Sequence, residues 1–158
     1  MALDPVRVIT AVDTNVVVAG LLSWHEHHEA ASAQLIGLLE SQGEVMIPLP
    51  TLVESYSVMT RLPPPYRLGS KDAFKILESS LRHRVALVGL DEDEGWTLLQ
   101  ELSERSISGG TTYDALILAC ARKGGARRLL TFNRSHFERI AVAEDIEIVV
   151  PGSTAGQP

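Results

Sequence analysis

A single stretch near the start of the chain, Arg7-Val8-Ile9-Thr10-Ala11-Val12-Asp13-Thr14-Asn15, decides the fold. Its first six residues are almost continuously apolar and rich in β-branched side chains, which is typical of a strand buried on both faces in a parallel sheet. The polar residues that follow favour turns and helix caps, so they end the strand. The sequence therefore predicts a covered sheet with a carboxylate, Asp13, at the carboxyl end of its first strand.

Strand and helix patterns alternate along the rest of the chain. Further strands are predicted at residues 45–47, 85–88, 128–131 and 146–150. Helices are predicted at residues 26–42, 51–61, 71–82 and 111–123, and another begins at Asp91 and turns Trp96, Leu99 and Leu102 inward. Such alternation implies right-handed crossovers and a parallel sheet with helices on both faces. We therefore expect an α/β fold, a three-layer α/β/α sandwich with a mainly parallel central sheet.

Length and composition indicate one domain. The chain has 158 residues, enough to bury a core without disulfides, and its single cysteine, Cys120, excludes an intramolecular disulfide. Residues 1–150 are expected to form one domain, and residues 151–158, rich in Gly, Pro and small polar residues, a disordered tail. The start of the chain lacks the pattern of a signal peptide, and no apolar run is long enough to span a membrane. These features predict a cytoplasmic protein with no membrane partner.

The charge of the chain limits how it can bind a polyanion. Twenty Asp and Glu outnumber fourteen Lys and Arg, which gives a net charge of −6. Proteins that hold nucleic acid by charge alone are usually basic on at least one face. A polyanion bound here must therefore meet a local basic patch or a metal ion that inverts the local charge. The acidic balance also suits a basic partner protein.

Three acids stand out by position, although each has an ordinary structural explanation. Asp13 suits a helix cap or an Asx turn. Glu54 lies early in its helix, where the dipole favours negative charge. Asp114 completes a capping-box pattern that begins at Thr111. Taken one at a time, these acids are better explained by structure than by catalysis.

As a set, Asp13, Glu54 and Asp114 indicate a site for a metal ion. All three lie at strand ends or in first turns of helices, so they can converge on one edge of the sheet, where open α/β sheets bind ligands. Three converging carboxylates repel one another unless a cation lies between them. Mg²⁺ prefers such oxygen ligands, and it polarises phosphates and activates water.

At this point the residues resemble a known family, the PIN-domain ribonucleases, and within it the VapC toxins of bacterial toxin–antitoxin pairs. The likeness extends to about residue 150. It is carried by four ordered motifs, which are Val12-Asp13-Thr14-Asn15, Glu54-Ser55, Tyr113-Asp114-Ala115-Leu116-Ile117 and Leu130-Thr131-Phe132-Asn133.

The resemblance implies a PIN-like fold and a metal-dependent endoribonuclease. It implies that Asp13, Glu54 and Asp114 hold Mg²⁺ or Mn²⁺ and that Thr131 and Asn133 complete the catalytic pocket. It also implies three kinds of partner: an RNA substrate, a cognate antitoxin protein and a second copy of the chain in a homodimer. Asn133 stands where many members carry Asp, so one tightly held metal is a safer expectation than two.

Two other functions compete with this interpretation. The first is a magnesium-dependent phosphatase or receiver-like domain that uses Asp13, because both place an Asp at the end of the first strand. Such phosphatases want a second Asp two residues on, where this chain has Asn15. The second is a catalytically silent PIN-like binding module whose acids only cap helices.

Overall fold

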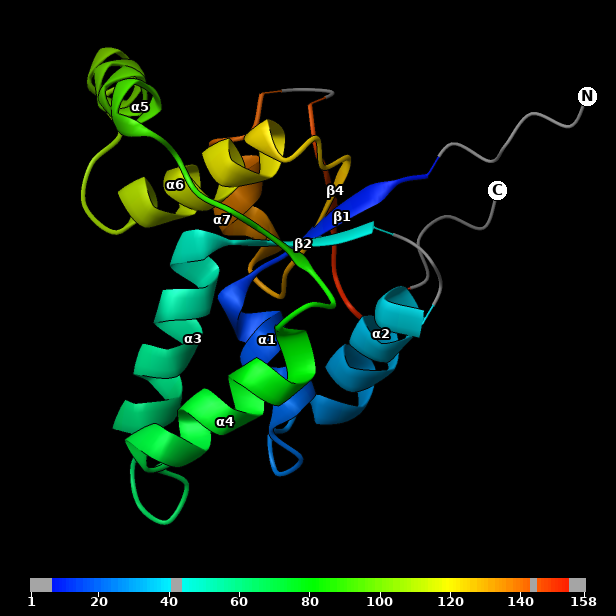
Figure 1. Ribbon diagram of the computed structural model, residues 1–158. Coiled ribbons are helices and arrows are strands. Elements are labelled where there is room, and N and C mark those ends of the chain that lie inside the picture. Colours follow the sequence, from blue (N-terminus) through cyan, green and yellow to red (C-terminus); the bar gives the residue numbers. More distant parts are fainter. Residues whose placement is uncertain (1–6, 41–43, 143–144, 154–158) are drawn as a thin grey trace, which may run out of the picture.

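A five-stranded sheet lies at the centre of the molecule (Figure 1), seen in a computed structural model that describes residues 7–40, 44–142 and 145–153. The strands are β1 (Ile9–Val12), β2 (Glu44–Pro48), β3 (Ala86–Val88), β4 (Arg128–Leu130) and β5 (Glu147–Val149). They lie in the order β3-β2-β1-β4-β5, and every pair is parallel. The predicted parallel sheet is confirmed, and its first strand is the central one.

Helices cover both faces of the sheet, which confirms the three-layer architecture. Below the sheet in Figure 1 lie α1 (Thr14–Leu21), α2 (His28–Glu40), α3 (Leu49–Arg61) and α4 (Ser70–Leu81). Above it lie α5 (Glu92–Glu104), α6 (Thr111–Lys123) and α7 (Arg134–Glu138). None of the helices in the described ranges is long and apolar enough to cross a membrane.

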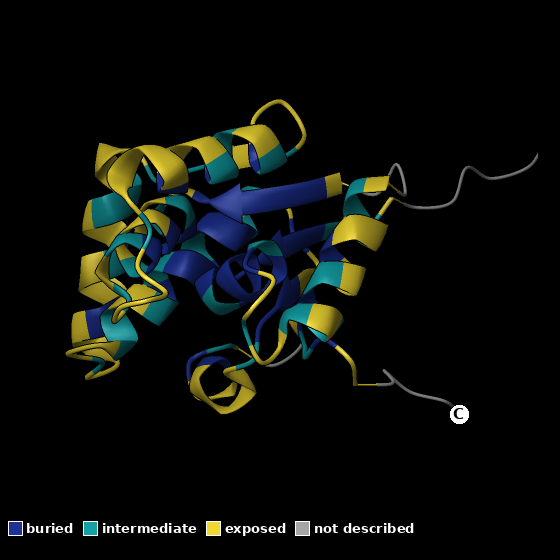
Figure 2. Cartoon of the chain, turned by 90° about the horizontal axis from the view of Figure 1, so that it is seen from below, coloured by how far each residue is buried: buried dark blue, intermediate teal, exposed yellow. Residues whose placement is uncertain are grey.

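Neighbouring strand residues supply two separate cores, one on each face of the sheet. Val12 and Leu130 pack with side chains from α1 to α4. Ala11 and Leu129 pack with side chains from α5, α6 and α7. Successive strand residues point to opposite faces, so a strand covered on both sides must be apolar throughout. Figure 2 shows the strands enclosed by helices whose outer surfaces are exposed.

The strand order places a change of direction between β1 and β4. From β1 the chain adds β2 and β3 on one side, and it then crosses to the other side to add β4 and β5. Open parallel sheets form ligand crevices at such a point, outside the carboxyl ends of the strands. Val12 is paired with Leu130, and the N–H of Asp13 donates to the carbonyl of Leu130 at 2.9 Å. The ends of β1 and β4 are therefore held side by side.

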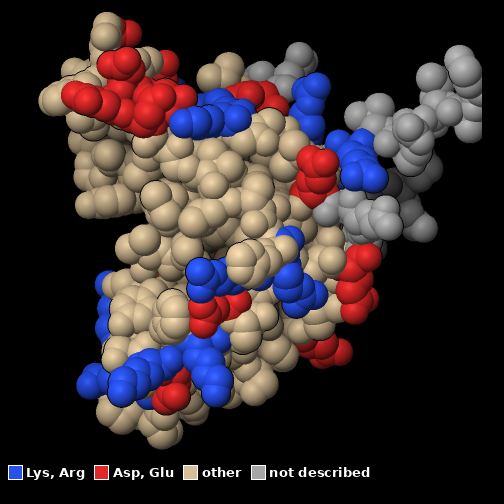
Figure 3. All heavy atoms as spheres, in the orientation of Figure 1, with Lys and Arg blue, Asp and Glu red and all other residues tan. Residues whose placement is uncertain are grey.

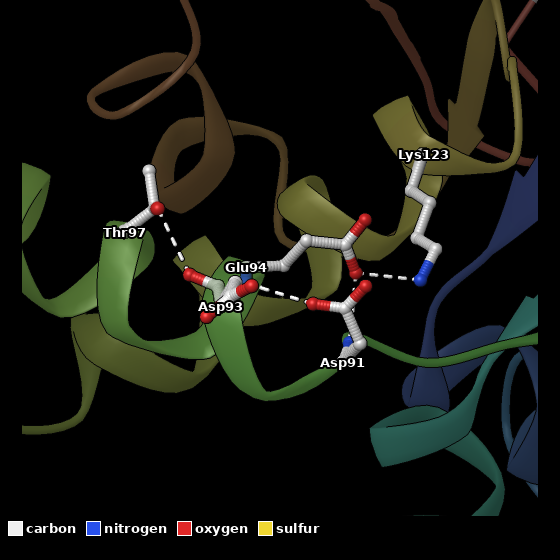
Figure 4. A network of polar contacts seen from close by, with 5 residues as sticks. All are labelled: Asp91, Asp93, Glu94, Thr97 and Lys123. Carbon is white, nitrogen blue, oxygen red and sulfur yellow. Dashed lines mark hydrogen bonds and ion pairs between the residues drawn. The ribbon is translucent and has the colours of Figure 1, made fainter.

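The structure corrects the prediction for α5. Trp96 is 68% exposed and Leu99 51% exposed, so of the three side chains predicted to turn inward only Leu102, at 4%, is buried. The acidic start of α5 is a capping box, in which Asp91 accepts from the N–H of Glu94 while Glu94 accepts from the N–H of Asp91. Figure 4 shows Lys123 of α6 pairing with the same Glu94 carboxylate. The face of α5 that packs against the core is formed by Leu98 and Leu102, so Trp96 and Leu99 lie outside the core.

Smaller differences concern the ends of elements. Helices α1 and α7 were not predicted, because α1 is an almost continuous apolar run without a helical period and the five residues of α7 are too few to display one. Of the predicted tail, Pro151 is buried and Ser153 donates through its hydroxyl to the carbonyl of Val150, whereas residues 154–158 lie outside the described residues. Residues 41 and 42, predicted to end a helix, also lie outside them.

The two leucines of α5 provide a direct test of its orientation. Leu102→Ala is expected to lower the free energy of unfolding by about 2–4 kcal/mol, because a buried leucine is replaced by a cavity. Leu99→Ala makes the same substitution at an exposed position and is expected to cost less than about 1 kcal/mol. Urea denaturation of both variants measures the difference, and equal losses would contradict the orientation of α5.

Candidate active site

Asp13 is the most buried carboxylate of the candidate site. It follows β1 directly, is 5% exposed and caps α1, because its Oδ1 accepts from the N–H of Thr14 at 2.7 Å. Its Oδ2 accepts from the hydroxyl of Thr131 at 2.7 Å. The cap suggested by the sequence is thus present, and the second hydrogen bond ties the carboxylate to the end of β4.

Thr131 organises the side of the site formed by the end of β4. It is fully buried, and its hydroxyl, besides donating to Asp13, accepts from the N–H of Asn133 at 2.9 Å and from the side-chain amide of Asn15 at 3.3 Å. Asn15 in turn accepts from the N–H of Phe132 at 3.2 Å. These bonds fix the turn after β4 against the start of α1. The sequence predicted only a turn at Asn15. No local pattern could predict its contact with Thr131, which lies 116 residues away in the chain.

Glu54 and Asp114 reach the site from two other helices. Glu54, in the second turn of α3, accepts from the hydroxyl of Thr14 at 2.9 Å and is exposed. Asp114, in the first turn of α6, is half-buried and lies 3.8 Å from Nδ1 of His136. The capping box predicted at Asp114 is wrong, because the N-cap of α6 is Gly110 and has no side-chain cap. The carboxylate of Asp114 is therefore free to face the site.

One pocket of about 240 Å³ brings four of the five predicted site residues together. Its lining consists of Asp13, Thr14, Asn15, Val18, His25, Glu54, Val58, Asp114 and Asn133. Thr131 lies behind this lining and acts on it through hydrogen bonds. His25, in the loop after α1, is half-buried and also lines the pocket. Its neighbour His28 instead has a structural contact, since its Nδ1 lies 2.8 Å from the carbonyl oxygen of Ala19.

The three carboxylates affect one another electrostatically. Burial raises the pKa of Asp13 to about 6; hydrogen bonds from Thr131 and Thr14 oppose this rise, and the charges of Asp114 and Glu54 add to it. Burial also raises the pKa of Asp114, where His136 opposes the rise and Glu54 adds to it. The site therefore concentrates negative charge in a poorly solvated place, where ionised carboxylates are costly.

The donors of this pocket fit a hard divalent cation. Carboxylate and amide oxygens are the ligands that such cations prefer, and a cation would offset the repulsion between the acids. Across the described ranges, however, no three His, Cys, Asp or Glu side chains are already grouped in a way that could hold a metal ion. Both oxygens of Asp13 are engaged by Thr14 and Thr131, and Glu54 is engaged by the Thr14 hydroxyl. The donor atoms of the pocket are thus of the kind that such a cation prefers, but they are not already arranged as a coordination sphere.

A second cleft, between α5 and α6, has charged walls but a structural explanation. It has a volume of about 360 Å³ and is lined in part by Asp93, Glu94, Arg122 and Lys123. Lys123 pairs with Glu94, and Arg122 pairs with Asp145. These ion pairs join α5, and the segment before β5, to α6, which explains the charged walls of the cleft.

Comparison with known proteins places the chain in a family. The PIN domain family matches residues 10–143. Ribonuclease VapC40 of Mycobacterium tuberculosis is 37% identical over 141 residues, which cover 88% of this chain and 98% of the relative. Ribonuclease VapC27 of the same organism is 32% identical over 111 residues, 70% of this chain and 75% of the relative.

Solved structures of lower identity share the fold. M. tuberculosis VapC20, described as a sarcin-ricin loop cleaving toxin, has a TM-score of 0.66 at 21% identity and covers 85% of this chain and 97% of its own. VapBC2 from Rickettsia felis, bound to a DNA fragment from its promoter, has a TM-score of 0.63 at 19% identity and covers 90% of this chain and 98% of its own.

The parallel sheet, the pocket at its point of reversal and these matches lead to one conclusion: the chain belongs to the PIN-domain family. The curated relatives it matches within that family are VapC ribonucleases. PIN-domain ribonucleases generally need divalent metal ions.

The buried carboxylate makes a prediction about stability and pH. Because the pKa of Asp13 is higher in the folded chain than its ordinary value of 3.8, the folded state binds this proton more tightly than the unfolded state. Its contribution to the free energy of unfolding therefore falls as the pH rises from about 4 to above 6. Without divalent cations, Asp13→Asn should be more stable than the native protein at pH 8, by about 1–3 kcal/mol.

Urea denaturation at pH 4.5 and pH 8 checks this expectation. The advantage of Asp13→Asn should shrink at the lower pH, where the native carboxyl is protonated. Asp72→Asn, at an exposed position in α4, supplies the background effect of the same substitution. A variant less stable than the native protein at pH 8 would contradict the electrostatic cost assigned to Asp13.

Proposed function

We propose that this chain is a metal-dependent endoribonuclease and the toxin of a toxin–antitoxin pair. One observation carries the proposal: Asp13, Glu54 and Asp114 come from distant parts of the chain and line a single pocket together with Asn133. Family membership and the VapC ribonucleases among the relatives support the same activity. Residues 1–150 are proposed to form a single PIN-like nuclease domain.

The proposed ligands of the cation, Mg²⁺ or Mn²⁺, are Asp13, Glu54 and Asp114. When bound, such an ion supplies a Lewis acid that polarises the phosphate and lowers the pKa of a water molecule. The chain's own groups prepare the site for it. Thr131 and the N–H of Thr14 fix the direction of the Asp13 carboxylate, and the hydroxyl of Thr14 holds Glu54 at the pocket.

The proposed reaction is the hydrolysis of an RNA phosphodiester by in-line attack of water on phosphorus. The bond from phosphorus to the 3′-oxygen breaks, which leaves a 3′-hydroxyl on one product and a 5′-phosphate on the other. Asn133 lines the pocket beside the three carboxylates and presents an uncharged amide there. Its position is fixed by the hydrogen bond from its own N–H to the Thr131 hydroxyl. An amide orients water through its oxygen but adds no negative charge, so the proposal assigns one tightly held ion.

The proposed partners follow from the relatives. Structures of VapBC complexes on DNA support a small DNA-binding antitoxin as the protein partner of this chain. A basic segment on such a partner would complement the net charge of −6. We further propose a homodimer acting in the cytoplasm, where its RNA substrates are.

The two competing functions are less well supported. A phosphatase that uses Asp13 needs a second Asp two residues on, but Asn15 stands there and its side-chain amide is bound to Thr131 and Phe132 in the turn after β4. A phosphoryl group on Asp13 after incubation with acetyl phosphate would favour this rival. A silent binding module leaves the convergence of three mutually repelling acids without a purpose.

Single substitutions test the catalytic assignment. Asp13→Asn and Asp114→Asn are each expected to lower RNA cleavage by about a thousandfold, since each removes several kcal/mol of charge stabilisation. Asp93→Asn changes an exposed acid of α5 and should cleave at the native rate. Purified proteins are incubated with total RNA, with and without Mn²⁺ and a chelator, and the 5′-phosphate ends are mapped. A triple Asp13/Glu54/Asp114 variant that cuts at the native rate would refute the site.

Metal binding is tested separately from cleavage. At a concentration of Mg²⁺ or Mn²⁺ one hundred times its dissociation constant, the ion should add about 2.7 kcal/mol to the free energy of unfolding. Chelation should reverse the gain, and Asp114→Asn should abolish it. Asn133→Asp adds a fourth carboxylate to the pocket and is expected to bind the ion more tightly. An equal melting shift in the native protein and in Asp114→Asn would argue against this set of ligands.

A further inference from the structure

Five aromatic rings form a continuous strip beside the candidate active site. In order along the strip they are Tyr66, Trp24, His25, His27 and Phe132. They come from three separate segments, namely the loops after α1 and α3 and the turn after β4. We propose that this aromatic strip is a binding subsite on which the bases beside the cleaved phosphate stack. The inference rests on the proposed function and assigns a substrate subsite to it.

The spacing of the rings makes the strip continuous. The ring centroids of Trp24 and Tyr66 are 4.7 Å apart, and those of His27 and Phe132 are 4.8 Å apart in a stacked arrangement. His25 joins the two pairs, at 6.3 Å from Trp24 and 5.8 Å from His27. Aromatic pairs at 4.5–7 Å attract one another, so the rings support each other's positions.

The strip is connected to the catalytic pocket at two places. His25, its central ring, lines the pocket together with Asp13 and Glu54. Phe132, its last ring, lies between Thr131 and Asn133 in the sequence, and its N–H donates to Asn15. A nucleotide stacked on the strip would therefore have its phosphate close to the three carboxylates.

The two rings at the Tyr66 end of the strip remain in contact with solvent. Trp24 is 42% exposed and Tyr66 is 47% exposed, although both are large and mostly apolar. Exposed aromatic side chains that are fixed by their neighbours are what proteins use to stack unpaired bases. Stacking accepts any base, because every base has a π-face.

Charge near the strip favours a nucleic acid over a basic protein. Residues 61–84 contain six of the chain's fourteen Lys and Arg and only two of its twenty Asp and Glu, in a chain that is acidic overall. Tyr66 lies inside this basic segment, between Arg61 and Arg67. Figure 3 shows basic side chains gathered at the foot of the molecule and acidic ones at the upper left, over α5. The strip thus adjoins the surface to which phosphates would be attracted.

The tryptophans of the chain allow a direct test. There are two, Trp24 in the strip and Trp96 on the exposed side of α5. Trp96→Phe leaves Trp24 as the only tryptophan, and Trp24→Phe leaves Trp96 as a matched control. Both are made in the full chain carrying Asp114→Asn, with a chelator present, so that binding is observed without cleavage. The probe is an oligouridylate of about 12 nucleotides, within the site sizes of single-strand binders.

The expected result is quenching of Trp24 fluorescence by the oligouridylate and none of Trp96 fluorescence. Trp24→Ala should weaken binding by roughly tenfold, which corresponds to one lost base stack, and Trp24→Phe should restore most of it. In the active protein, Trp24→Ala should raise KM for a single-stranded RNA and leave kcat almost unchanged. Trp96→Ala should change neither.

Several outcomes would overturn the inference. Equal quenching of Trp24 by heparin, or by a double-stranded RNA of the same length, would mean that charge, and not stacking, brings the ligand to the strip. Unchanged RNA binding in Trp24→Ala, with loss of binding to a protein partner instead, would make the strip a protein-docking surface. Cleavage without any response of Trp24 would refute the strip and leave the proposed function intact. Quenching without cleavage in the native protein would support the strip and count against the nuclease.

Discussion

The hydrogen bond between the Thr131 hydroxyl and the Asp13 carboxylate is the interaction on which the site depends. It joins the ends of β1 and β4, where the order of the sheet reverses, while the other oxygen of Asp13 caps α1. A buried carboxylate with fewer partners would be too costly at this place. With these two partners it still carries an electrostatic penalty, visible in its raised pKa. This electrostatic penalty falls at the edge of the sheet where a bound cation would offset it.

The architecture around this bond explains why the other acids reach the same pocket. Helix α3 begins directly after β2, and α6 packs against the opposite face of the sheet, so the early turns of both helices lie near the end of β1. Glu54 and Asp114 therefore approach Asp13 from opposite faces. Their mutual repulsion destabilises the site when no cation is bound. The same concentration of negative charge attracts a cation, which offsets the repulsion.

An acidic chain that binds RNA must separate its charges. Here the acids concentrate in the pocket and at the start of α5, whereas the basic residues concentrate between residues 61 and 84. The aromatic strip reaches the pocket through His25 and the basic segment through Tyr66. This arrangement reconciles the net charge of −6 with a polyanionic substrate.

Local sequence determined the elements of this protein. The apolar run before Asp13 required a strand covered on both faces, and the alternating pattern required a parallel sheet between helices, because periodicity is a property of neighbouring residues. Tertiary structure alone decided which residues meet. The contacts of Thr131 with Asp13 and Asn15 span more than one hundred residues, the strip of rings draws on three loops, and Asp114 faces the pocket although its sequence suggested a cap. Trp96 and Leu99 had the period of an inward face, yet the face that packs against the core is that of Leu98 and Leu102, which leaves Trp96 and Leu99 in solvent. Periodicity shows that a helix has an apolar face, but only packing decides what covers it.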